Sequence, residues 1–360
     1  MSVSLNTIEK KIGKSKDITQ KTLDKYMKSL ETLLLRYLDV NPRPKFSLSV
    51  FYDFKTVKEK LDKVKPGSRV GFIVPIILTL RQYASARKKE IKINGAKKSV
   101  IEAYSNYLSA TNREIEDRYD THKLTKDEKD NWIDFKDVIK LREKKKKDIK
   151  IDFNTLKKLS PQKREEYVNK NYKAKDIDKV QQWVVLSYYT YLPPQRNDAA
   201  TLIMVRPGSK NPKNSNYLSI DDKVVVLKYY KTRRARERKQ KREGTNENLD
   251  VVIELPPELI NVIKQWMLVN PTDFFLINTT SHTQMSKNGL TRYMNKIFSP
   301  KKVSTSLLRK SMWHHAFPML HDPVKMKELA YKMVHNLDTV QQVYRKRIEQ
   351  GGGGFGDYAP

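Results

Sequence analysis

The spacing of apolar residues predicts that the first part of the chain is helical. In residues 23–38 apolar side chains recur at three- and four-residue intervals, which places them on one helix face: Leu23, Met27, Leu30, Leu34 and Leu38. Residues 56–64, 68–90 and 99–121 are expected to be helices on the same grounds. The pattern therefore predicts an all-helical N-terminal domain over residues 1–122.

From about residue 123 the pattern becomes mixed. A mostly buried helix is expected over residues 178–191, followed by a helix-to-strand segment at 195–205. Residues 217–232 predict a hairpin, and residues 250–255 predict a third strand. Further helices are expected over residues 257–268, 286–298, 304–320 and 322–334. The predicted fold class is mainly α with a small antiparallel β-sheet, with an α+β domain over residues 123–350.

Two segments are too polar to form part of a core. Residues 233–244 are mostly Arg, Lys and Glu, and we expect them to form a mobile basic loop. The simplest use of such a loop is contact with a DNA backbone, for which the candidate side chains are Arg233, Arg234, Arg236, Arg238 and Lys239. Residues 351–360 are rich in glycine and predict a flexible tail.

The composition narrows the class of partner. The 360-residue chain has 72 Lys and Arg against 41 Asp and Glu, a formal net charge of +31. Such an excess repels itself unless a polyanion binds, so double-stranded DNA is the expected partner. A membrane surface is disfavoured, because there is no basic amphipathic anchor and no apolar run approaches the roughly 18 residues of a span. The absence of cysteine excludes disulfides and thiol catalysis and suits an intracellular place of action.

Several common catalytic motifs are absent from the sequence. There is no glycine-rich phosphate loop and no dinucleotide fingerprint. One cluster contains several side chains that commonly bind metals: His314, His315, His321 and Asp322. Adjacent histidines cannot share one helix face, which argues against a metal there. We therefore expect neither a metal site nor a cofactor.

What remains is a set of cations and one tyrosine in the second domain: Arg196, Lys231, Arg309, His335 and Tyr344. His335 stands nine residues before Tyr344, with a predicted helix start at Asp338 between them. These side chains suit the attack of a tyrosine hydroxyl on a phosphodiester. Arginines match phosphate oxygens, and a lysine whose pKa is lowered by nearby arginines can protonate the leaving 5′-oxygen. Guanidinium groups can stabilise the developing charge without a metal.

The order of these elements resembles that of the tyrosine recombinases, or phage-type integrases. The resemblance covers roughly residues 125–348. It rests on four segments: Tyr191-Leu-Pro-Pro-Gln-Arg196, Lys231-Thr232, Ser306-Leu-Leu-Arg309 and Val334-His-Asn-Leu-Asp-Thr-Val-Gln-Gln-Val-Tyr344. The double proline before Arg196 is most similar to integrases of large DNA viruses of protists and their satellite viruses. The resemblance implies that Arg196 and Arg309 hold the scissile phosphate and that Lys231 is the general acid. It likewise implies that His335 binds phosphate and that Tyr344 is the nucleophile.

Three positions leave alternatives open. The family usually has a histidine three residues before the second arginine, and here that residue is Ser306, which cannot act as a base at neutral pH. An acid often stands three residues after the first arginine. Here Asp198 stands two residues after it, and it either orients the arginine or only caps the local turn. Lys228 competes with Lys231 as the lysine at the end of the hairpin.

The leading hypothesis is a site-specific recombinase that cuts and rejoins DNA through a covalent 3′-phosphotyrosyl intermediate. The two domains are expected to clamp duplex DNA mainly through phosphates, with four protomers on two sites and a monomer or dimer off DNA. A type IB topoisomerase would use the same five-part site to relax supercoils as a monomer. A catalytically silent DNA-binding protein, with Ser306 as a mark of lost activity, is the alternative from another class.

Overall fold

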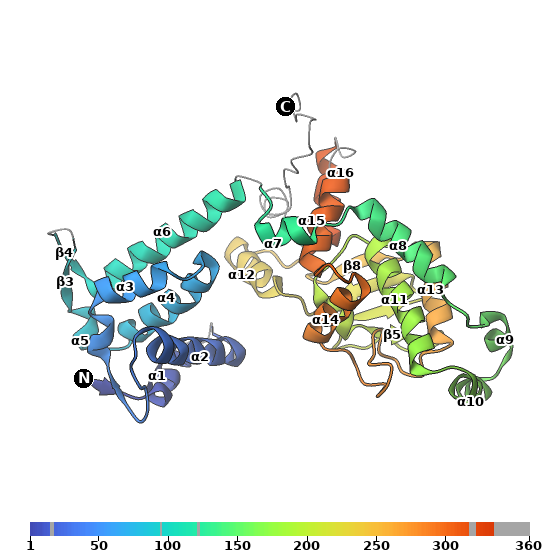
Figure 1. The fold of residues 1–360 in the computed structure, drawn as a ribbon, viewed down its shortest axis with the longest axis horizontal. Coiled ribbons are helices and arrows are strands. Elements are labelled where there is room, and N and C mark those ends of the chain that lie inside the picture. The colour runs from blue at the N-terminus through green and yellow to red at the C-terminus, as the bar shows by residue number, and fades with distance from the viewer. Residues whose placement is uncertain (15–17, 94–95, 121–122, 317–321, 335–360) are drawn as a thin grey trace. The chain divides into compact units, whose positions relative to one another are not determined.

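The computed structural model describes residues 1–14, 18–93, 96–120, 123–316 and 322–334 (Figure 1). The chain forms two compact units, Met1–Thr121 and His122–Pro360. Both are mainly helical and their strands form small sheets, which confirms the predicted fold class. Within the described residues, no helix is both long and apolar enough to cross a membrane.

The first unit is built around helix α4. Its helices are α1 (Leu5–Ile12), α2 (Gln20–Tyr37), η1 (Leu48–Phe51), α3 (Phe54–Asp62), α4 (Pro66–Arg81), α5 (Ala84–Arg87) and α6 (Val100–Asp120). α4 packs against both α2 and α6. The apolar face predicted for residues 23–38 is largely buried, with Leu30 and Leu34 fully inside the core.

Two short strand pairs also occur in this unit, and the sequence pattern did not predict them. β1 (Ser2–Val3) pairs with β2 (Phe46–Ser47), and β3 (Glu90–Ile93) pairs with β4 (Ala96–Ser99). Strands of two to four residues are too short to produce a readable alternation of apolar and polar positions. The helix predicted over residues 68–90 ends earlier, at Arg81, and residue 90 belongs to β3.

A buried arginine joins three helices of the first unit. Arg69 of α4 donates to Glu114 Oε2 of α6 at 2.9 Å and to backbone carbonyls at and just beyond the end of α3. Beside it, the Tyr107 hydroxyl donates to Asp62 Oδ1 at 2.6 Å. Burial alone would raise the pKa of Asp62, but hydrogen bonds from Lys58 and Tyr107 bring it below its ordinary value.

The second unit contains the larger hydrophobic core. Its helices outside the sheet region are α7 (Lys126–Asn131), α8 (Phe135–Lys147), α9 (Phe153–Lys158), α10 (Pro161–Asn171), α11 (Ala174–Tyr191), α13 (Pro257–Met267), α14 (Lys287–Ile297), α15 (Thr305–Ala316) and α16 (Pro323–Lys332). α11 lies between α8 and α13 (Figure 1). It is buried on nearly all sides, as its apolar sequence predicts. Its C-terminal end leads directly to the loop that carries Arg196.

A four-stranded sheet completes this unit, in the order β5 (Ile203–Val205), β6 (Tyr217–Ser219), β7 (Val224–Leu227) and β8 (Val251–Glu254). β6, β7 and β8 are antiparallel neighbours, which confirms the predicted hairpin and third strand. β5 runs parallel to β6. β8 stands at the edge of the sheet, so one side of its backbone must find partners elsewhere.

The expected mobile loop at residues 233–244 is wrong. The structure shows a helix, α12 (Arg233–Glu243), with no buried residue. Ion pairs one turn apart support it, between Arg233 and Glu237 at 3.1 Å and between Lys239 and Glu243 at 3.8 Å. The prediction failed because high charge excludes burial but does not exclude a helix, and Arg, Lys, Glu and Gln are all good helix formers.

Candidate active site

The loop that carries Arg196 is fastened to the end of α11 by two buried tyrosines. Tyr188 donates its hydroxyl to Gln195 Oε1 at 2.6 Å, and Tyr189 donates to the Arg196 carbonyl at 3.3 Å. Gln195 in turn donates to the Pro193 carbonyl at 2.7 Å. The helix ends before the double proline because proline has no backbone N–H to donate. The three hydrogen bonds then hold the turn after the helix in place. The backbone of Arg196 is therefore held firmly against the core.

The Arg196 side chain is half-buried, and one of its N–H donor groups has no hydrogen-bond acceptor among the described residues. Its Nη1 atom is buried and has no hydrogen-bond partner among the described residues. A buried charged donor without an acceptor is costly, and native proteins rarely keep one without a use. A planar guanidinium in this state suits an anionic oxygen such as that of a phosphodiester.

Asn197 connects this loop to two later helices. Its Oδ1 accepts a hydrogen bond from the Thr305 hydroxyl at 2.7 Å, at the first residue of α15. Its Nδ2 donates to the Lys287 carbonyl at 2.9 Å and to Thr291 Oγ1 at 2.8 Å, both on α14. The short helix η2 (Asn197–Thr201), which begins after Arg196, is thereby joined to the helix that carries Arg309.

Arg309 is buried on the inner side of α15, with only 2% of its surface exposed. Its Nε donates to the Thr305 carbonyl at 3.3 Å, and its Nη2 donates to Ser306 Oγ at 2.9 Å. Ser306 itself is exposed. The residue that stands where a histidine was expected therefore contacts Arg309 and orients its guanidinium.

The ionisation of Tyr189 shows that the two arginine segments share one neighbourhood. Burial raises the pKa of Tyr189, the charge of Asp198 raises it further, and the charge of Arg309 opposes them. The same Tyr189 hydroxyl donates to the Arg196 carbonyl. Arg309 is therefore close enough to act electrostatically on a group that contacts the Arg196 backbone.

Asp198 is paired with a lysine that the sequence did not single out. Asp198 is 3% exposed and accepts from Lys287 Nζ at 2.6 Å. This ion pair offsets one negative and one positive charge beside the two arginine segments. Nothing in the sequence around Lys287 marks it; its role follows from the packing of α14 on η2.

Lys228 and Lys231, the two candidates for the lysine at the end of the hairpin, have different environments. Lys228 Nζ donates to the carbonyls of Pro212 and Lys213, at 3.4 and 3.0 Å, and lies over the Tyr217 ring. Lys231 is exposed in the turn between β7 and α12, and its ammonium group makes no hydrogen bond or ion pair with another described residue. The structure thus leaves Lys231 free to meet a ligand, but it shows no contact between Lys231 and the two arginines.

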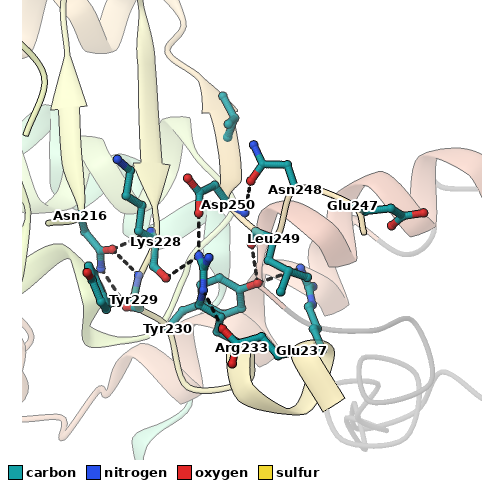
Figure 2. A network of polar contacts seen from close by, with 12 residues as sticks. Asn216, Lys228, Tyr229, Tyr230, Arg233, Glu237, Glu247, Asn248, Leu249 and Asp250 are labelled. Atoms are coloured by element: carbon teal, nitrogen blue, oxygen red, sulfur yellow. Dashed lines mark hydrogen bonds and ion pairs between the residues drawn. The ribbon is translucent and has the colours of Figure 1, made fainter. Parts of the chain in front are cut away.

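The cations of the basic helix α12 differ in their contacts, and Figure 2 shows those of Arg233. Arg233 Nη1 donates to Asp250 Oδ1 at 2.6 Å and to the Lys228 carbonyl at 2.7 Å, which anchors the helix to the sheet. The contact with Asp250 raises the pKa of Arg233. Arg236 lies over Tyr230. Lys239 pairs with Glu243, whereas Arg234 and Arg238 are exposed and make no ion pair with another described residue.

The predicted residues His335 and Tyr344 lie outside the described residues, as does the tail. The structure describes the chain as far as Val334, which is 1% exposed and belongs to the core of the second unit. Two residues earlier, the Lys332 carbonyl accepts from Gln195 Nε2 at 3.4 Å. The chain that precedes His335 therefore passes beside the residue that precedes Arg196.

His314 and His315, at which the sequence argued against a metal, pack on aromatic rings. His314 meets Trp132 edge-on, and His315 stacks on Phe135. In the described ranges, no group of three or more His, Asp or Glu side chains could hold a metal ion. A separate open cavity of about 550 Å³ between α8 and α11 is lined mainly by lysines, and none of the candidate catalytic residues lines it.

Comparison with known proteins gives little further information. No family model matches the chain, and no curated protein matches it. Among solved structures, the chain is similar to the crystal structure of XerA recombinase, with a TM-score of 0.35 and 10% sequence identity. That similarity covers 96% of this chain and 94% of the XerA chain. A TM-score this low does not establish a shared fold.

Proposed function

We propose that this protein is a tyrosine recombinase that cuts and rejoins double-stranded DNA. The observation that carries the proposal is the joining of Arg196 and Arg309, which are far apart in sequence, through Asn197, Thr305 and Tyr189. Asp198 is paired with Lys287, and in this proposal the guanidinium groups of Arg196 and Arg309 bind one phosphodiester. Arginine forks fit this anion and keep their charge at any physiological pH.

The reaction needs a nucleophile and a proton donor in addition to the arginines. The Tyr344 hydroxyl gives up its proton to water and attacks the scissile phosphorus, a Tyr–O–P bond forms, and the P–O5′ bond breaks. Lys231 gives a proton to the departing 5′-oxygen, and His335 binds a non-bridging oxygen. The resulting 3′-phosphotyrosyl ester keeps the bond energy, so a 5′-hydroxyl from a second strand can reverse the attack and release Tyr344.

Ser306 has a positioning role in this scheme. A serine hydroxyl cannot act as a base near neutral pH, but it can accept from a guanidinium. The bond from Arg309 Nη2 to Ser306 Oγ fixes the plane of the arginine fork, and bidentate binding of phosphate depends on that plane. Protonation of the leaving 5′-oxygen then rests on Lys231.

The exposed stripe of α12 supplies contacts with the DNA backbone. Residues one turn apart on a helix share a face, and on α12 this face carries four exposed cations: Arg234, Arg238, Lys241 and Arg242. The anchoring residues Arg233 and Arg236 lie on the other side. Such a row of charges binds phosphates without reading sequence. Four protomers on two DNA sites would complete the exchange of strands.

Covalent capture on DNA tests this proposal. Because the target sequence is unknown, the substrate is a library of nicked duplexes of random sequence. After cleavage next to a nick, the short fragment that carries the free 5′-hydroxyl diffuses away, and the enzyme stays bound to the 3′-phosphate. We expect a denaturant-resistant protein–DNA adduct that Tyr344→Phe abolishes and Tyr229→Phe preserves. A silent DNA-binding protein would retain the library without any adduct. Relaxation of supercoiled plasmid without exchange between captured sites would favour a type IB topoisomerase.

A further inference from the structure

Tyr331, in the last turn of α16, makes hydrogen bonds to backbone groups along the free edge of strand β8. Its hydroxyl accepts from the Val252 backbone N–H at 3.3 Å and donates to the Asp250 carbonyl at 3.4 Å. Val252 lies on the edge strand β8 and Asp250 immediately precedes that strand, so these backbone groups lie along the edge at which a neighbouring strand would pair. A single side-chain hydroxyl takes the place of that strand and ties α16 to the sheet.

The ring of Tyr331 also faces the basic helix. The Arg236 guanidinium lies 6.0 Å from the Tyr331 ring centroid and 5.4 Å from that of Tyr230. Arg236 Nη1 donates to the Tyr230 hydroxyl at 3.4 Å, and that hydroxyl donates to the Leu249 carbonyl at 2.6 Å. Cation–π contacts of this kind favour one placement of α12 over α16. Arg236 is thus the contact through which α12 and α16 meet.

The residue after Tyr331 contacts the candidate active site. The Lys332 carbonyl accepts from Gln195, the neighbour of Arg196. Val334 is buried and has a φ of 60°, a left-handed conformation that a β-branched residue adopts only when its surroundings impose it. The end of α16 is therefore held on one side by the basic helix and β8, and on the other by the Arg196 loop.

We propose that Arg236 and Tyr331 are positioning residues that couple DNA contact by α12 to the Arg196 site through α16. DNA that binds the exposed stripe of α12 restrains that helix. The Arg236–Tyr331 contact passes the restraint to α16, and the Lys332–Gln195 bond passes it to the Arg196 loop. The inference rests on the proposed function for its catalytic consequence, but the coupling itself concerns DNA binding and α16 alone.

Two matched pairs of variants separate coupling from loss of charge or of a hydroxyl. Arg236→Gln and Arg238→Gln remove the same charge from the same helix, but only Arg236 contacts the tyrosines. Tyr331→Phe and Tyr229→Phe each remove one hydroxyl, and Tyr229 is 56% exposed with a hydroxyl that makes no hydrogen bond to another described residue. All four are made in the full-length chain, and thermal unfolding confirms that each variant folds.

The first measurement is hydrogen exchange of α16 and of residues 193–197 with and without a random-sequence DNA duplex. We expect DNA to protect both segments in the unaltered protein and in Tyr229→Phe, and to protect them much less in Arg236→Gln and Tyr331→Phe. Equal DNA-induced protection in all four variants would overturn the coupling, whether or not the protein is a recombinase.

The second measurement is the rate of covalent adduct formation at saturating DNA. We expect Arg236→Gln to be roughly five- to tenfold slower than Arg238→Gln, and Tyr331→Phe to be slower than Tyr229→Phe by a similar factor, which is the size expected from one or two lost contacts. Equal rates within each pair would contradict the proposal. If the unaltered protein forms no adduct, the proposed function fails instead, and the exchange experiment alone decides the coupling.

Discussion

The hydroxyl of Thr305 donates to Asn197 Oδ1 at 2.7 Å, and this bond joins the neighbour of Arg196 to the helix of Arg309. The Thr305 carbonyl also accepts from Arg309 Nε. One threonine therefore contacts both arginine segments, through its side chain on one side and its backbone on the other. The relative placement of the two arginines depends on this residue.

Replacement of Thr305 by valine should separate the arginines with little change in volume. Thr305→Val keeps the branched shape and the carbonyl but leaves the Asn197 side chain without its donor, which should destabilise the unit by about 1 kcal/mol. We expect adduct formation to fall by roughly tenfold or more, because small misplacements are amplified in catalysis. DNA affinity, measured by fluorescence anisotropy, should change less than twofold. A matching loss of affinity would show that Thr305 acts on binding instead.

Ser306 offers a second test of how Arg309 is oriented. Ser306→Ala removes the acceptor of Arg309 Nη2 at an exposed position, so the fold should be unaffected and the adduct rate should fall roughly threefold to tenfold. Single-turnover kinetics across pH 6–9 measure this. If Ser306 only orients Arg309, the shape of the pH profile stays the same in the variant. A shifted profile would mean that the serine takes part in proton transfer.

The exposed stripe of α12 predicts the salt dependence of DNA binding. Each phosphate contact that is lost should reduce the slope of log K against log salt by about 0.9. Arg234→Gln combined with Arg238→Gln should therefore lower the slope by about 1.8. The matched control is Lys163→Gln with Lys170→Gln, the same charge change at exposed positions on α10. A slope that falls equally in both double variants would indicate general charge effects rather than contact by α12.

The cluster around Arg69 predicts a loss of stability in acid. The pKa of Asp62 is lower in the folded protein than in the unfolded chain, so its contribution to stability is present above about pH 4 and is lost as the pH falls through the folded value. Asp62→Asn should weaken this dependence between pH 5 and 3. Urea unfolding followed by circular dichroism measures it, with Asp117→Asn, at an exposed site on α6, as the control.

The four tryptophans make that measurement specific to one unit. They are Trp132, Trp183, Trp266 and Trp313, and all lie in the second unit. Tryptophan fluorescence should therefore show no difference between Asp62→Asn and the unaltered protein, while circular dichroism shows it. A difference of equal size in both signals would indicate that the two units unfold together.

Regular elements with strong periodicity were predictable from the sequence, and contacts between distant segments were not. Helix α11 and the strands β7 and β8 were predictable because their apolar residues form a clear local pattern. α12 was missed as a helix because charge was given more weight than helix propensity. Lys287 and Tyr331 could not be found in this way, since their partners Asp198 and Val252 lie far away in the sequence.

The site itself was partly accessible to sequence reasoning. The order of motifs predicts Arg196 and Arg309 as site residues, and the structure joins their segments through residues that have no motif of their own, Asn197 and Thr305. The lysine of the hairpin was left open between two positions, and the contacts of Lys228 now favour Lys231 as the available one. His335 and Tyr344 remain predictions.

The central claim is that Tyr344 attacks DNA, and peptide mapping of the captured adduct tests it most directly. The adduct is digested with protease and nuclease, and the modified peptide is sequenced by mass spectrometry. The account predicts a nucleotide linked through its 3′-phosphate to Tyr344, and no adduct from Tyr344→Phe. Attachment at any other residue, or an adduct that survives Tyr344→Phe, would contradict it.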